Sequence, residues 1–120
     1  MTLAQLREKY SGVVLAYGAI SDRELGIPGE FDLQGILPSR RVVDWYNGSL
    51  DYNLKPNEFN LEETERVAII GNGNIACDMS RILLRSPKDL ETSDAPQSVI
   101  SHLSKSNLHT IEMIGRRGIT

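Results

Sequence analysis

A short apolar run that ends in a glycine-rich turn constrains the fold of this chain more than any other feature. Residues 67–70 are all aliphatic, and the pattern Gly-x-Gly-x-x-Ala follows directly at Gly71, Gly73 and Ala76. Four aliphatic residues in a row predict a buried parallel strand. The first glycine suits a tight turn, and the second lets the backbone approach a pyrophosphate. The pattern therefore predicts the start of a dinucleotide-binding βαβ unit.

The residues after the turn predict an amphipathic helix over 74–85. Ile75, Met79, Ile82 and Leu83 have the spacing of one helical face, which we expect to be buried. The N-terminus of such a helix offers N–H groups and a partial positive charge to an anion. The residues expected to bind the pyrophosphate are Gly71, Asn72, Gly73, Asn74 and Ile75.

A second apolar run, over residues 109–114, also ends in glycine and is followed by Arg116 and Arg117. In a βαβ unit this position lies beside the adenosine ribose of the bound cofactor. A carboxylate here binds the 2′-hydroxyl of NAD, whereas an arginine here binds the 2′-phosphate of NADP. No Asp or Glu follows the run, so NADP is preferred. The arginines come about 45 residues after the first glycine rather than about 20. We therefore interpret the polar stretch 86–107 as an insertion that carries one short helix at about 94–106.

Composition excludes several classes of protein. The chain has 120 residues, 40% of them apolar, and a net charge of −3, which argues against a nucleic-acid surface. No segment approaches the roughly 20 apolar residues of a membrane span. The single cysteine, Cys77, excludes an internal disulfide and is expected to be a small packing residue. His102 and His109 are expected at the surface, with no metal site.

The remaining segments predict short elements of an α/β fold, a Rossmann-like parallel sheet with flanking helices. We interpret Trp45 and Tyr46 as core or interdomain packing. The expected elements are a helix at 2–10 with Thr2 as a possible cap, a buried strand at 12–19, a turn at 27–30, a helix at 39–46 with Ser39 as its N-cap, and a surface loop at 51–63.

These segments together resemble the adrenodoxin reductase family, the mitochondrial-type ferredoxin–NADP reductases, over nearly the whole chain. The most specific matches are Trp-Tyr-Asn-Gly at 45–48 and Ile-Gly-Arg-Arg-Gly at 114–118. The others lie at 13–19, 27–30, 71–78 and 81–84. The resemblance implies that residues 72–75 form the family's pyrophosphate loop. It also implies that Arg116 and Arg117 are its pair for the 2′-phosphate.

The resemblance further implies an enzyme that binds FAD in one domain and NADP(H) in a second domain inserted into it. Hydride then passes to the flavin, and electrons leave singly to a [2Fe–2S] ferredoxin of the adrenodoxin type. Residues 1–35 would end an FAD-domain segment, and residues 36–120 would form the first half of the NADP domain. The chain would be a mitochondrial fragment, with FAD bound mainly by parts absent from it. Asp78 would face the flavin side and act in a proton relay, or else be only a carboxylate stabilised by the helix dipole.

Two other functions remain open at this point. One is the NADPH domain of a related flavoprotein with two dinucleotide sites, such as a glutamate-synthase small subunit. The other is a non-catalytic nucleotide-binding module. A thiol–disulfide reductase would need Cys-x-x-Cys, which the sequence lacks.

We expect the 120-residue chain by itself to bind no stoichiometric FAD and to have no NADPH–ferredoxin reductase activity. Its sequence holds one Gly-x-Gly pattern, at 71–73, and that pattern is assigned to NADPH. The flavin absorbance of the purified chain tests the expectation on FAD binding. An assay of NADPH-dependent reduction of an acceptor tests the expectation on activity. A yellow, active preparation would contradict the expectation.

Overall fold

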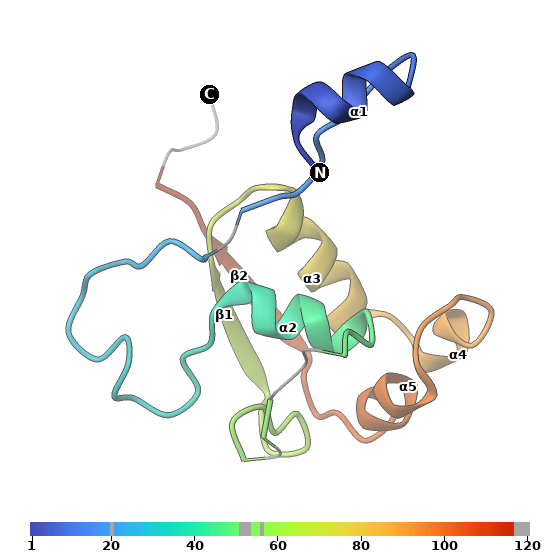
Figure 1. Ribbon diagram of the computed structural model, residues 1–120. Helices are drawn as coiled ribbons and strands as arrows, with labels where there is room; N and C mark the ends of the chain where they lie inside the picture. The colour runs from blue at the N-terminus through green and yellow to red at the C-terminus, as the bar shows by residue number, and fades with distance from the viewer. Residues whose placement is uncertain (20, 51–53, 56, 117–120) are drawn as a thin grey trace.

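The computed structural model describes residues 1–19, 21–50, 54–55 and 57–116. The strands β1 and β2 pair in parallel, and the crossover between them carries α3, α4 and α5 (Figure 1). This arrangement confirms the predicted Rossmann-like α/β fold. In chain order the elements are α1 (Leu3–Lys9), α2 (Ser39–Tyr46), β1 (Arg66–Ile70), α3 (Asn74–Leu84), α4 (Pro87–Leu90), α5 (Gln97–Leu103) and β2 (Thr110–Ile114).

The two-stranded sheet is covered on one face only. Its register runs from Arg66 opposite Thr110 to Ile70 opposite Ile114. Ile69 is 7% exposed, whereas its neighbour Ile70 is 57% exposed. The prediction of a buried strand therefore holds for one face of β1 and is wrong for the other, because neighbouring side chains of a strand point to opposite faces and the helices pack against one of them. On the open face, an ion pair between the Arg66 guanidinium and the Glu112 carboxylate joins the strands.

Helix α3 packs on the sheet through a stripe that differs from the predicted one. Its buried residues are Ala76, Met79 and Leu83, which recur at the i, i+3, i+7 spacing of one helical face. Ile75 is 55% exposed and Cys77 is exposed, so the predictions of a packing role for both are wrong. Ala76 is 5% exposed and lies on the buried side of α3, so its chain neighbours Ile75 and Cys77 point away from the core.

The insertion between α3 and β2 contains two helices rather than one. Pro87 lies in the first turn of α4, and Pro96 is the N-cap of α5. Proline favours the start of a helix and cannot continue one, which explains why the predicted helix at 94–106 begins only at Gln97. Although the insertion is polar overall, four of its side chains belong to the hydrophobic core: Leu90, Val99, Ile100 and Leu103.

The segment predicted as a surface loop also contributes to the core. Leu54 is 7% exposed and Leu61 is fully buried, so the loop interpretation is wrong at these two positions, while residues 51–53 and 56 lie outside the described residues. The backbone N–H of Asn107 donates to the Leu61 carbonyl oxygen at 2.9 Å. This bond ties the segment to the chain just before β2.

Three aromatic side chains form a cluster where α2, the 54–63 segment and α5 meet. Trp45 makes edge-to-face contacts with Phe59 and His102 at centroid distances of 5.1 and 5.3 Å. The prediction that Trp45 packs in the core is confirmed, since it is 5% exposed. His102 is half-buried rather than on the surface, and this burial lowers its pKa. Its ring is therefore more readily neutral than that of an exposed histidine.

The N-terminal third is mostly irregular. The predicted helix at 2–10 is confirmed as α1, with a capping box between Thr2 and Gln5. The predicted buried strand at 12–19 is wrong: the segment forms no strand, and Val14 and Tyr17 are exposed. Among the described residues the sheet consists of β1 and β2, and the segment at 12–19 pairs with neither of them.

Two predicted features next to this segment do form. The turn at 27–30 has Gly29 at a φ of +92°. The carboxylate of Glu30 accepts bonds from the backbone N–H groups of Leu25 and Gly26. Helix α2 has the predicted bounds, although its N-cap is Pro38 rather than Ser39.

Leu61→Ala should destabilise the chain by about 2–5 kcal/mol, because it leaves a cavity at a fully buried position. Leu50→Ala, at an exposed leucine, should change the free energy of unfolding by no more than about 0.5 kcal/mol. Denaturant unfolding of both variants measures the difference. Equal effects would contradict the placement of Leu61 in the core.

Candidate functional site

The first glycine of the turn has a conformational role. Gly71 follows β1 with a φ of +125°, a region that side-chain-bearing residues rarely adopt. Its backbone N–H donates to the carbonyl oxygen of Ile114, the last residue of β2, at 2.8 Å. This hydrogen bond holds the start of the turn against the end of the second strand.

The second glycine has no such conformational role. Gly73 is the N-cap of α3, with a φ of −84° and a ψ of −176°, which is extended backbone that any residue adopts. A Cβ atom built at Gly73 would meet nothing within 4 Å. The protein itself therefore leaves open space above this residue, which is the space that a pyrophosphate needs at the second glycine of the pattern.

The N-terminus of α3 suits an anion. No side chain caps it among the described residues, and Asn72, Asn74 and Ile75 around it are exposed. The first N–H groups of the eleven-residue helix therefore face the open space above Gly73, with the positive end of the helix dipole behind them.

Arg116 lies two residues beyond β2 and is exposed. The bond between Gly71 and Ile114 places the start of this segment beside the glycine turn. A guanidinium at this position can donate two parallel hydrogen bonds to a phosphate. Arg117, its predicted partner, lies outside the described residues.

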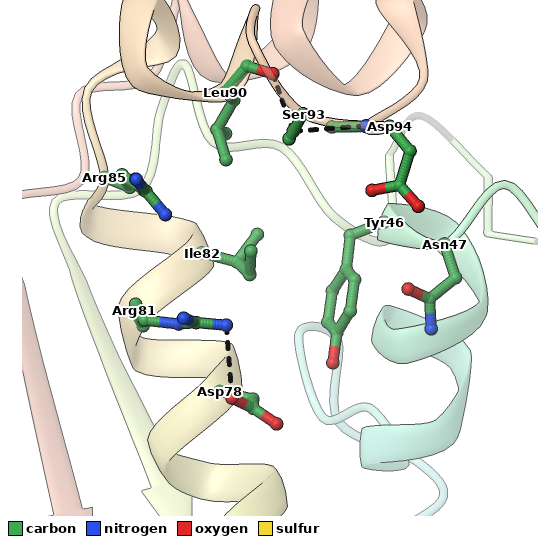
Figure 2. A pocket seen from close by; sticks show the side chains of 10 residues that line it. Tyr46, Asn47, Asp78, Arg81, Ile82, Arg85, Leu90, Ser93 and Asp94 are labelled. Carbon is green, nitrogen blue, oxygen red and sulfur yellow. Dashed lines mark hydrogen bonds and ion pairs between the residues drawn. The ribbon is translucent and has the colours of Figure 1, made fainter.

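Asp78 does not belong to the glycine turn. It lies one turn into α3, and its carboxylate is 3.5 Å from the guanidinium of Arg81. Both side chains line a groove between α2, α3 and the segment after α4, opposite Tyr46 (Figure 2). The structure thus gives Asp78 a charged partner on its own helix, and its role in a proton relay stays a prediction.

Tyr46 is a residue of this region that the sequence did not assign to a site. Burial, and after it the negative charge of Asp78, raise the pKa of Tyr46, while Arg81 opposes the shift. The phenol therefore keeps its proton and can donate it in a hydrogen bond. Only the packing of α2 against α3 brings these residues together, and no spacing in the sequence indicates it.

The described residues show neither a metal site nor a membrane span. In this part of the chain no three His, Cys, Asp or Glu side chains are grouped as metal ligands. None of the described helices has both the length and the apolar character that crossing a membrane requires.

A parallel βαβ unit with a glycine-rich turn before its first helix is the fold class of dinucleotide-binding domains. No family model matches the chain. Individual proteins do match it. The mitochondrial NADPH:adrenodoxin oxidoreductase of Arabidopsis thaliana is 46% identical over 98% of the chain and 24% of its own length. The human enzyme of the same name is 40% identical over 98% of the chain and 23% of its own length.

A solved structure matches the same range. FprA from Mycobacterium tuberculosis in complex with NADPH is 36% identical, with a TM-score of 0.75, and the match covers 98% of this chain and 25% of that one. Over nearly its whole length the chain is similar to proteins named NADPH:adrenodoxin oxidoreductase, which confirms the predicted resemblance. It spans about a quarter of the length of the curated relatives it matches.

Gly73→Val should abolish NADPH binding by the full-length protein without unfolding it. A branched side chain would fill the open space, while the backbone at this position tolerates any residue. Titration with NADPH and thermal unfolding measure the two effects. Gly71→Val is the contrasting variant and should lower stability, because its φ of +125° strains an L-residue. Normal binding by Gly73→Val would place the pyrophosphate elsewhere.

Proposed function

We propose that this chain is the NADPH-binding part of a flavoprotein reductase that passes electrons from NADPH through FAD to a [2Fe–2S] ferredoxin of the adrenodoxin type. The observation that carries the proposal is the open space above Gly73, at the uncapped N-terminus of α3 and beside the segment that leads to Arg116. The names of the relatives and the NADPH bound to FprA support the choice of cofactor.

In this proposal the chain binds and orients the cofactor rather than reacting with it. NADPH supplies the hydride when it is bound. The N–H groups at the start of α3 hold the pyrophosphate, with Gly71, Asn72, Gly73, Asn74 and Ile75 as the binding residues. Arg116 and Arg117 hold the 2′-phosphate. Hydride transfer depends on how two rings are positioned, so these contacts are the contribution that the chemistry requires from this part of the protein.

The proposal also covers the organisation of the longer protein. Residues 1–35 end an FAD-domain segment, and residues 36–120 form the first half of the NADP-binding domain. The exposed side chains of Val14, Leu15 and Tyr17 support this division, because an apolar segment of this kind is suited to pack against further strands. FAD binds mainly outside this chain. The relatives' names support a mitochondrial location.

Asp78 keeps the role that the family resemblance suggests, a proton relay on the flavin side. Its exposure supports an accessible carboxylate, and Arg81 gives it a charged neighbour on the same helix. A carboxylate that only complements the helix dipole is the competing explanation.

Arg116→Ala and Arg117→Ala in the full-length protein should each weaken NADPH binding by about 1.5–3 kcal/mol, the cost of losing a hydrogen bond to a charged group. NADH binding should stay nearly unchanged, because NADH has no 2′-phosphate. Titration with both cofactors measures the ratio. Equal losses for NADPH and NADH would contradict the assignment of the arginines to the 2′-phosphate.

A further inference from the structure

An arginine at the start of α2 contacts the N-terminal part of the chain. The guanidinium of Arg40 donates a hydrogen bond to the carbonyl oxygen of Ala19, which lies 21 positions earlier in the sequence. The Nε atom of Arg40 also lies 3.7 Å from the carboxylate of Asp22. Both contacts cross the proposed boundary between residues 1–35, the FAD-domain segment, and residues 36–120, the NADP-binding domain.

The two sides of this contact belong to different parts of the proposed enzyme. Ala19 ends the apolar segment at 12–19, whose exposed side chains are suited to pack against further strands of the FAD domain. Arg40 lies in the first turn of α2, and α2 packs against α3, the helix that follows the glycine turn (Figure 1). The Arg40 contact therefore links the FAD side of the chain to the helices beside the predicted NADPH site.

The connection over residues 23–39 is ordered by hydrogen bonds of its own. The Glu30 carboxylate accepts a bond from the backbone N–H of Leu25 at 2.8 Å. The side-chain amide of Gln34 donates to the carbonyl oxygen of Asn57 at 3.0 Å. The guanidinium of α2 joins the two ends of this connection, so it closes an ordered loop between the two parts of the chain.

We propose that Arg40 is a positioning residue, which holds the NADP-binding domain in the orientation that hydride transfer to the flavin requires. This role deepens the proposed function and rests on it. A guanidinium can bond to two partners in one fixed geometry, so a rotation of α2 relative to Ala19 and Asp22 breaks both contacts. Hydride transfer depends steeply on the alignment of the two rings. The loss of Arg40 should therefore slow the transfer and leave the affinity for NADPH unchanged.

The first test compares Arg40→Gln with the wild type in the full-length protein. We expect the rate of flavin reduction at saturating NADPH, followed by stopped-flow absorbance, to fall about tenfold or more. The Kd for NADPH and the midpoint of thermal unfolding should stay unchanged, which separates positioning from binding and from stability. Lys105→Gln is the matched control and should alter none of the three quantities. Lys105 makes an exposed ion pair of similar length, 3.8 Å to Glu62, within the proposed NADP-binding domain.

A second test measures the orientation without any cofactor reaction. One spin label is attached to Cys77, which is exposed on α3, and the other to Glu8→Cys, at an exposed position on α1. The other cysteines of the full-length protein are replaced by serine. Pulsed EPR then gives the distribution of distances between the two labels. Arg40→Gln should broaden or shift this distribution, and Lys105→Gln should leave it unchanged.

The two tests separate the role of Arg40 from the proposed function. An unchanged distance distribution in Arg40→Gln would overturn the role, and so would an unchanged rate of flavin reduction. A loss of NADPH affinity as large as the loss of rate would also overturn it, because Arg40 would then be a binding residue. A wild-type protein that binds neither NADPH nor flavin would refute the proposed function, and the role in hydride transfer with it. A protein that binds both while Arg40→Gln behaves as the wild type would refute the role of Arg40 alone.

Discussion

The parallel pairing of β1 with β2 determines where the glycine turn and the segment leading to Arg116 lie. It brings the carboxyl ends of both strands to one edge, where the N–H of Gly71 bonds to the carbonyl of Ile114 at 2.8 Å. Residues 45 positions apart in the chain, the first glycine and Arg116, are thereby held in one region. A ligand with a pyrophosphate and a further phosphate can then contact both, which no single segment of the chain achieves.

The two glycines of the turn have different roles. Gly71 is required by its backbone, whose φ of +125° excludes most residues. Neither the backbone conformation nor any described neighbour requires glycine at position 73, since a Cβ there would meet nothing within 4 Å. The proposed pyrophosphate contact would give this glycine a reason. The open sheet face and the exposed N-terminal segment agree with a chain that spans about a quarter of its relatives' length.

The insertion connects the fold to the groove beyond the glycine turn. The insertion buries four apolar side chains in the hydrophobic core, so its helices α4 and α5 contribute to the stability of the fold. The segment after α4 then closes one end of the groove opposite Arg81 and Arg85. His102, on α5, contacts the ring of Trp45 on α2, which fixes the helix that carries Tyr46. The same packing thus stabilises the core and holds Tyr46 beside α3.

Local signals along the chain were sufficient to predict several elements. Aliphatic runs predicted β1 and β2, the glycine pattern predicted the turn, and capping residues predicted α1. The bounds of α2 and the start of α3 also followed from local signals. Which face of each element is buried depends instead on contacts between elements far apart in the chain. Ile75 and Cys77 are exposed because the buried side of α3 runs through Ala76, Met79 and Leu83. The apolar segment at 12–19 pairs with neither β1 nor β2 among the described residues. Leu61, His102 and Tyr46 owe their places to contacts with residues more than 30 positions away, and such contacts leave no periodic signal in the sequence.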